Sequence, residues 1–345
     1  MPATGPASPL PGLFHRLKRV GYDDAFLRRA VLPDWWDDSL ADNPASWAQI
    51  QLRIAQRLSL PLGDLVDASK ALSLPDVSGI RLKRAKRGTA REDLAAGMVA
   101  ARNAVRLVVP HLQNLSPLPA NLTAAALRKW VLERNPTVDL GGLLEACWAH
   151  GIAVFHFAPL PTEAKKFAGM AYYEGDRPVI VLASGYDEPA RLAFHLAHEV
   201  AHVIRGHVKP GGAILCEASF EGANEDEDER EADGDALELL TGRRNPQLNP
   251  IYGLTAPKLK AEALREGKRS GIHAGTLALI YGKTAERMPV AVNALKLMNM
   301  NAGARAIIAG ALGRRLYGND ATTAAADLPG AVVELLPLFG LDCPA

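Results

Sequence analysis

His198-Glu199-Val200-Ala201-His202 form an H-E-x-x-H motif in the second half of a 345-residue chain. Side chains four positions apart share one face of an α-helix, so His198 and His202 can bind one metal ion together. Glu199 lies slightly off that face, where it can take a proton from a metal-bound water. Residues of these types at this spacing are typical of zinc-assisted hydrolysis of a peptide bond.

The flanking sequence predicts that the motif lies on a buried helix. Asp187 is a suitable N-cap, Pro189 suits the first turn, and an apolar stripe follows at Leu192, Leu196, Val200 and Val203. The alternative is a pair of core histidines that bind no ligand. That alternative is disfavoured because burying two imidazoles one turn apart leaves polar atoms to be satisfied.

A third protein ligand is expected, because catalytic zinc sites usually have three. The extended pattern with glycine at position 205 and histidine at position 208 fails, since these positions hold Arg205 and Val208. An acidic helix from residue 224 onward offers Glu229 as the ligand, and Asp233 one turn later can hold a ligating histidine in place. One alternative that remains open is a purely solvated acidic helix. Another is a different third ligand, with Glu231 as the main rival and Glu217 and Glu221 behind it.

A donor for the oxyanion is also expected beside the metal. Three residues are candidates, although each is more often structural than catalytic: Tyr172, Tyr173 and His195. Cys216 is interpreted as a lone buried thiol.

Composition bounds the class of protein. The chain is 48% hydrophobic and 22% charged with a formal net charge of +1, so its overall charge gives no case for nucleic-acid binding. Its three cysteines are widely spaced and form no zinc-knuckle or disulfide pattern, which favours a reducing cytoplasm. The sequence shows no signal-peptide pattern and no apolar run that would cross a membrane.

Apolar periodicity predicts helices before and after a short β region. The helices expected in the first half cover residues 47–58, 92–109, 123–134 and 139–150. Strands are expected where β-branched and aromatic residues gather, over residues 152–157, 169–174 and 178–183. Glu174-Gly175-Asp176-Arg177 is a hairpin turn signal between the last two. The sequence therefore predicts an α+β, mostly helical fold with a small antiparallel sheet packed by the H-E-x-x-H helix.

We expect four segments along the chain. They are an all-helical N-terminal domain over residues 1–112, a linker over 113–121, a metallopeptidase domain over 122–290 and a helical extension over 291–345. The N-terminal region contains a basic stretch that could contact phosphates, or be merely solvated: Arg81, Lys83, Arg84, Lys86 and Arg87.

The chain resembles the ImmA/IrrE-type zinc metallopeptidases. The resemblance rests on two strand-like segments and two helical motifs in the expected order: residues 151–154, 178–182, 191–202 and 229–240. It implies a zincin-like core with the third ligand on the second helix. Two positions depart from the family pattern, namely Asp235 in place of an apolar residue and Gly242 in place of a proline. Residues 44–66 also resemble, weakly, the last two helices of a phage-repressor-type helix-turn-helix domain.

The resemblance implies an intracellular zinc endopeptidase, with one Zn²⁺ per chain and Mn²⁺ as the other possible metal. Its implied substrate is a regulatory protein such as a helix-turn-helix repressor, in stress response, mobile-element control or toxin–antitoxin control. The alternatives are a DNA-binding regulator that uses the peptidase-like domain as a sensor or scaffold, and an antitoxin that acts by binding. Glu199 favours the enzyme, since a scaffold needs no general base.

Overall fold

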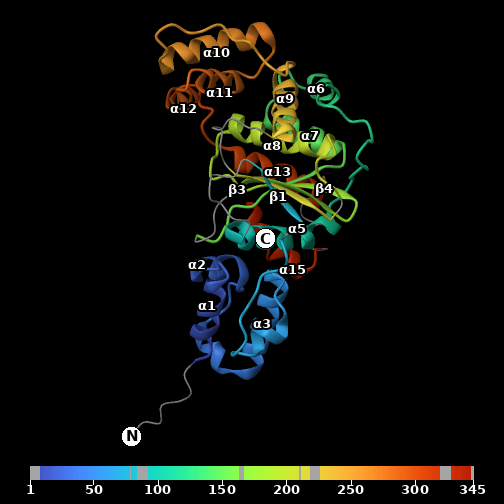
Figure 1. Ribbon diagram of the computed structural model, residues 1–345, viewed down its shortest axis with the longest axis vertical. Helices are drawn as coiled ribbons and strands as arrows, with labels where there is room; N and C mark the ends of the chain where they lie inside the picture. Colours follow the sequence, from blue (N-terminus) through green and yellow to red (C-terminus); the bar gives the residue numbers. More distant parts are fainter. Residues whose placement is uncertain are drawn as a thin grey trace.

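The computed structural model describes residues 8–77, 79–83, 92–162, 167–209, 211–217, 226–318 and 328–342. Its elements form three groups along the long axis of the molecule (Figure 1). Short helices from the N-terminal region lie at one end, a sheet with its covering helices lies in the middle, and three helices from residues 256–297 lie at the other end.

The N-terminal group packs around a helix that begins at a side-chain cap. The side chain of Asn43 accepts hydrogen bonds from the backbone N–H groups of Ala45 and Ser46, which starts the helix expected over residues 47–58. Its apolar face is buried at Ile50, Ile54 and Leu58, so the predicted helix is confirmed. The elements of this group are α1 (Leu10–Arg19), α2 (Asp24–Phe26), η1 (Leu27–Val31), η2 (Asp38–Asp42), α3 (Pro44–Leu58) and α4 (Leu62–Val66).

The central sheet has the strand order β1-β5-β3-β4-β2. Its strands are β1 (Ile80–Lys83), β2 (Ala153–His156), β3 (Phe167–Glu174), β4 (Arg177–Leu182) and β5 (Ala213–Glu217). The predicted hairpin is confirmed, because β3 and β4 are antiparallel and turn at Gly175, whose φ of +59° suits glycine.

Two expectations about the sheet are wrong. The sheet is mixed rather than antiparallel, since β1 runs parallel to β5 and β2 runs parallel to β4. Parallel neighbours are joined by long crossovers, which leave no local turn signal in the sequence. The expectation of a wholly helical region over residues 1–112 also fails at β1, because the charges of Arg81 and Lys83 obscure a four-residue strand of alternating polarity.

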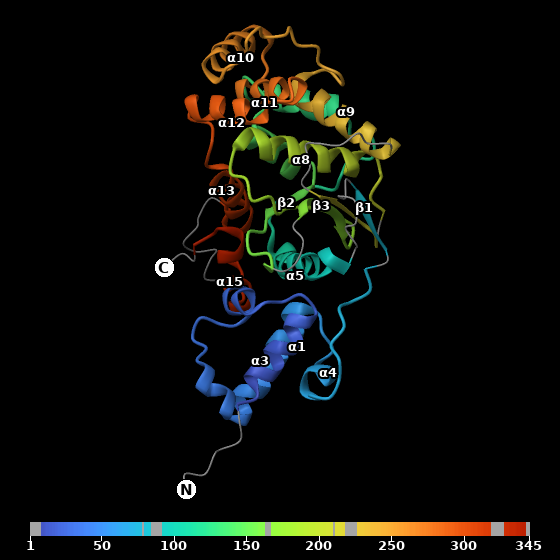
Figure 2. The ribbon, with the colours of Figure 1, turned by 60° about the vertical axis from the view of Figure 1, so that its left-hand side comes forward.

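Helices cover both faces of the sheet. In Figure 2, α8 (Pro189–Ile204) lies on one face and α5 (Glu92–Val108) lies on the other. The helices α7 (Leu140–Ala149) and α9 (Glu227–Thr241) pack against α8, and α6 (Ala124–Leu132) packs against α7 and α9. The helix α13 (Ala304–Tyr317) packs against β2 and α7. Three further short elements are described in this part of the chain: η3 (Val109–His111), α15 (Gly330–Val333) and η4 (Leu336–Phe339). The site helix α8 is therefore enclosed between the sheet and other helices.

A second, smaller hydrophobic cluster holds the helices at the far end. It joins α10 (Ala256–Ser270), α11 (Ala274–Thr284) and α12 (Met288–Leu297) through buried side chains such as Leu259, Leu277 and Leu295, and it reaches α8 at Ala190. The predicted limit after residue 290 falls inside α12, while α13 returns to the central core. Among the residues that the structure describes, no helix has the length and apolar character to span a membrane.

Asp187 connects the start of α8 to the start of α13. It was the expected N-cap of α8, but that position is taken by Glu188, whose side chain makes no cap hydrogen bond. The Asp187 carboxylate instead accepts hydrogen bonds of 2.9 Å from the backbone N–H groups of Gly303 and Arg305. Burial would raise the pKa of Asp187, but these two amides outweigh burial and lower it.

We predict that Asp187→Ala lowers the free energy of unfolding by about 1 kcal/mol, the usual cost of losing a cap. The folded pKa is depressed, so the stabilisation is present above the unfolded pKa of about 3.9 and is lost as the pH falls through the folded value. Urea unfolding at pH 7 and at low pH measures this difference. Asp34→Ala, at an exposed loop position, is the control, and an equal effect of both variants would contradict the assignment.

Candidate metal centre

The helix α8 holds the H-E-x-x-H motif in a dry environment. It is buried along its whole length from Ala190 to Val203, and His198, Glu199 and His202 are exposed by only 3%, 1% and 0%. The two histidines are one turn apart, and their Nε2 atoms lie 3.1 Å from each other. Each imidazole therefore presents a ring nitrogen to the same point.

The helix α9 brings a carboxylate to that point. The Glu229 oxygens lie 3.3 Å from Nε2 of His198 and 3.1 Å from Nε2 of His202. Glu229 is 1% exposed and lies in the first turn of α9, where the helix dipole favours negative charge. The rival Glu231 points elsewhere, toward Arg205 and His207. The structure thus brings Glu229, and not Glu231, to the histidine pair.

The spacing and protonation of these groups fit a metal ion. Ligands about 2.0–2.1 Å from one tetrahedral zinc lie about 3.3–3.4 Å apart, close to the spacing of the three donors. Burial lowers the pKa of His202 to about 4, so the ring is neutral and its Nε2 lone pair is available near pH 7. Burial would raise the pKa of Glu229, but its contacts with His198 and His202 outweigh burial and hold that pKa far below its usual range. A neutral imidazole and an ionised carboxylate are the ligand forms that zinc requires.

Residues behind the histidines fix which ring nitrogen carries the proton. Asp233 Oδ1 lies 3.1 Å from Nδ1 of His198, so that nitrogen donates to the carboxylate and Nε2 keeps its lone pair. His202 Nδ1 lies 3.0 Å from Nδ1 of His207, and His207 Nε2 lies 3.3 Å from Glu231 Oε2. A chain of donors from His202 through His207 to Glu231 leaves Nε2 of His202 free of hydrogen. The role expected for Asp233, to hold a ligating histidine in place, matches this geometry. The contact between His202 and His207 could not be predicted, because no motif spacing in the sequence specifies it.

The candidate base Glu199 packs against a strand that lacks a side chain at that position. A methyl group placed on Gly169 of β3 would lie 2.8 Å from both Cγ and Cδ of Glu199. Real side chains do not approach so closely, so glycine at this position provides the space that the carboxylate occupies.

Comparison with known proteins agrees with this geometry. Residues 147–245 match the model of a peptidase family, M78, described as the IrrE N-terminal-like domain. These residues form an ImmA/IrrE-type metallopeptidase domain. All three candidate ligands and Glu199 lie within it. No curated protein and no solved structure gave a match.

Both departures from the pattern of this peptidase family have a local explanation. Asp235 is 4% exposed and pairs with Arg205, 2.8 Å away at the end of α8, and with Arg244. An aspartate at this position therefore ties α9 to α8 by charge rather than by apolar contact. Gly242 has a φ of +83° and ends α9 as a left-handed C-cap, which glycine adopts at little cost.

The oxyanion candidates are placed differently from one another. Tyr172 is fully buried on the face of the sheet opposite α8, where its ring stacks under Arg102 of α5 at 4.7 Å; proposing it as an oxyanion donor was wrong. Successive residues of a strand point to opposite faces, so Tyr173 faces α8, but it lies four residues along β3 from Gly169. His195 lies one turn before Glu199 on α8 and is 9% exposed.

The basic candidates for nucleic-acid contact serve a different role where they are described. Lys83 is 8% exposed and pairs with Asp226 and with Asp228, the latter at 3.2 Å. Arg81 also pairs with Asp228, at 3.0 Å. Proposing Lys83 as a phosphate contact was wrong, because it instead ties β1 to the beginning of α9. Arg84, Lys86 and Arg87 lie outside the described residues, as do Glu221 and the side chain of Glu217.

Cys216 of β5, interpreted from the sequence as a lone buried thiol, lies beside the candidate ligands. It is 3% exposed and its Sγ lies 3.9 Å from Nε2 of His202. The donor atoms of Cys216, His198, His202 and Glu229 all lie within 4.8 Å of one another. No spacing in the sequence reveals this cysteine, because a strand crossing under α8 brings it to the site.

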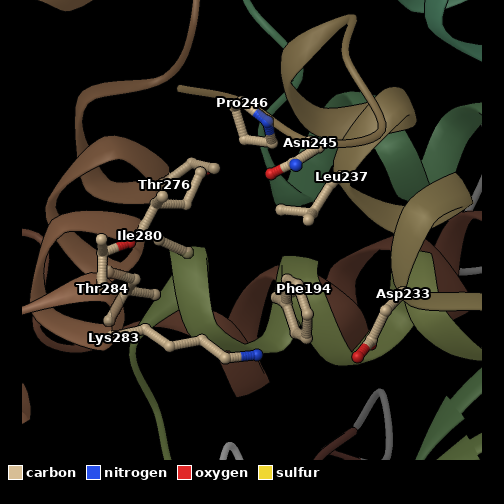
Figure 3. A pocket seen from close by; sticks show the side chains of 11 residues that line it. Phe194, Asp233, Leu237, Asn245, Pro246, Thr276, Ile280, Lys283 and Thr284 are labelled. Atoms are coloured by element: carbon tan, nitrogen blue, oxygen red, sulfur yellow. The ribbon is translucent and has the colours of Figure 1, made fainter. Parts of the chain in front are cut away.

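A cavity of about 350 Å³ adjoins the metal centre. It lies between α8, α9 and α11, with Phe194 at its floor and Leu237 and Ile280 on its walls (Figure 3). Asp233 also lines it, so one residue contacts both the cavity and the ligand His198.

We predict that Gly169→Ala lowers the rate of peptide cleavage by about 100-fold, the usual effect of displacing a catalytic group by about 1 Å. The metal content should stay unchanged, because the three atoms nearest to a methyl group on Gly169 all belong to Glu199 and none to a ligand. Elemental analysis and a cleavage assay on the same preparation measure both. Gly185→Ala is the matched control, since a methyl group there meets nothing within 4 Å, and a loss of rate in both variants would refute the packing argument.

Proposed function

We propose that this chain is a zinc-dependent endopeptidase that cleaves a regulatory protein inside the cell. The observation that carries the proposal is the convergence of His198, His202 and Glu229 on one point, with the carboxylate of Glu199 on the same helix. A sensor or scaffold would have no use for a buried general base beside a metal site.

Zinc is the metal that the donor set favours. Imidazole nitrogen suits zinc, whereas manganese is more often held by carboxylate, carbonyl and water oxygens. Two of the three donors here are imidazoles, and Mn²⁺ remains the second candidate. The two cysteines that the structure describes, Cys147 and Cys216, form no disulfide, which is compatible with a reducing cytoplasm.

When bound, zinc supplies a Lewis acid that lowers the pKa of a water toward about 7 and polarises the peptide carbonyl. Glu199 accepts the proton of the attacking water on its carboxylate and then delivers it to the leaving amine. His198 and His202 are held in one orientation by Asp233 and His207, so the donors need no rearrangement before reaction. His195, and with less support Tyr173, are the residues we propose as oxyanion donors.

The substrate we propose is a transcriptional repressor of the helix-turn-helix type, whose removal would switch genes on. This proposal rests on the resemblance to ImmA/IrrE-type enzymes. The apolar cavity beside Asp233 supports a protein substrate, because its size suits one large apolar side chain near the cleavage point.

The alternative functions, a DNA-binding regulator or an antitoxin, have less support. The helix α4, the second of the two helices in the weak helix-turn-helix resemblance, spans five residues and has no basic one. Lys83 and Arg81 are engaged by aspartates. Salt-dependent affinity for random duplex DNA would favour the regulator, and a stable complex unaffected by Glu199→Gln would favour the antitoxin.

We predict that the purified protein holds about one zinc per chain, and that Glu229→Gln weakens zinc affinity by at least about 100-fold. Removing a metal ligand should weaken zinc affinity more than removing a residue that hydrogen-bonds to a ligand, which weakens the affinity by about 10–100-fold. Glu231→Gln acts only through His207, so the loss should be about tenfold at most. Competition with a chromogenic chelator measures the affinities.

Glu227→Gln is the matched control for this series, because Glu227 lies on the same turn of α9 with its side chain 73% exposed. It should leave the affinity unchanged. If Glu231→Gln lost zinc and Glu229→Gln kept it, the assigned ligand would be wrong. No zinc uptake by the wild type would end the metallopeptidase proposal.

We predict that Glu199→Gln keeps its zinc but cleaves at a rate lower by about 100-fold to 10,000-fold, the usual contribution of general acid–base catalysis. Labelling of new protein N-termini in a host-cell lysate, with wild type and variant compared, measures the cleavage and finds the substrate. New N-termini that appear equally with both proteins would show that Glu199 is not the base.

A further inference from the structure

The side chain of Cys216 points toward the metal ligands because of its register in the sheet. Cys216 pairs with Gly169 of β3, and paired residues of antiparallel strands point to the same face. Gly169 contacts Glu199 on the α8 side, so the sulfur of Cys216 faces α8 as well. Because Gly169 has no side chain, nothing from β3 separates this sulfur from the helix.

The position of the sulfur suits a shared metal. Its distance to Nε2 of His202 is 3.9 Å, while sulfur and nitrogen ligands about 2.3 Å and 2.0 Å from one tetrahedral zinc lie about 3.5 Å apart. The four donor atoms fall within 4.8 Å of one another. Cysteine thiolate is among the ligands that zinc binds most readily.

The number of protein ligands decides whether a zinc site is catalytic or closed. Catalytic sites have three protein ligands and keep one position for water, whereas sites with four protein ligands are closed. Here all four donors are buried, with exposures of 3% for His198, 0% for His202, 3% for Cys216 and 1% for Glu229. Four protein donors are therefore available here, which is the number that closed zinc sites use.

We propose that Cys216 is a fourth protein ligand of the metal and that it keeps the peptidase latent. This inference rests on the proposed metallopeptidase function. On binding, the S–H bond of Cys216 breaks, the proton passes to the solvent and a sulfur–metal bond forms, with no transfer of electrons. Water can take the fourth position only after the sulfur has left it, so cleavage begins when Cys216 is withdrawn.

Cobalt(II) in place of the native metal tests the ligand directly. The full-length protein is stripped with a chelator and reloaded with cobalt, and its absorption spectrum is recorded. We expect a near-ultraviolet charge-transfer band from thiolate to cobalt in the wild type. In Cys216→Ala, and in the near-isosteric Cys216→Ser, the band should vanish while about one cobalt per chain stays bound.

Cys147→Ala is the matched control, because Cys147 is a buried thiol of α7 outside the metal cluster. It should keep the band. Cobalt bound at one per chain without a thiolate band in the wild type would overturn the role of Cys216 and leave the metallopeptidase proposal standing. Failure of the wild type to bind cobalt or zinc would overturn both.

Azide tests whether the fourth position is open. We expect azide to change the visible cobalt spectrum of Cys216→Ala but not that of the wild type, since only the variant has a free coordination position. Zinc-loaded Cys216→Ala should also cleave labelled casein at least tenfold faster than the wild type or Cys147→Ala. An azide response of equal size in the wild type would show that the site is already open and that no latch exists.

Discussion

Glu229 carries a negative charge in a position that is 1% exposed, and the packing of α8 against α9 depends on how that charge is satisfied. An isolated carboxylate cannot be buried without large cost. Burial lowers the pKa of His202 to about 4, so this histidine offers Glu229 no full positive charge near pH 7. A divalent cation between the three side chains would balance the charge. Metal binding is therefore expected to be coupled to the packing of the two helices.

Contacts beyond the metal ligands also hold α9 against α8. Three acidic residues of α9 contact residues in α8 or just after it. Asp233 contacts His198, Glu231 contacts His207, and Asp235 contacts Arg205. The acidic character of α9 thus serves the interface with α8, where a purely solvated helix would have no such partners. Lys83 adds a third element, since it ties the edge strand β1 to the first turn of α9.

The sheet sets what surrounds the ligands on the other side. A mixed order of strands places β3 and β5 side by side beneath α8. This neighbourhood puts a glycine under the candidate base and a thiol under the candidate ligands. Whether the fourth coordination position is open or closed therefore depends on the pairing of β3 with β5. The same pairing leaves little volume for a larger residue in place of Gly169.

The sequence by itself determined the local parts of this protein. The H-E-x-x-H helix, the acidic second helix and the β3–β4 hairpin were all predictable, because periodicity, capping residues and turn residues act within a few positions along the chain. Only the tertiary structure decided which acid meets the histidines, that Tyr172 faces away from the site and that Lys83 is engaged in an ion pair. It also decided the pairing of β1 and β2 and the arrival of Cys216. These depend on contacts between residues far apart in the sequence, whose energies come from burial and charge compensation in three dimensions and leave no periodic trace along the chain.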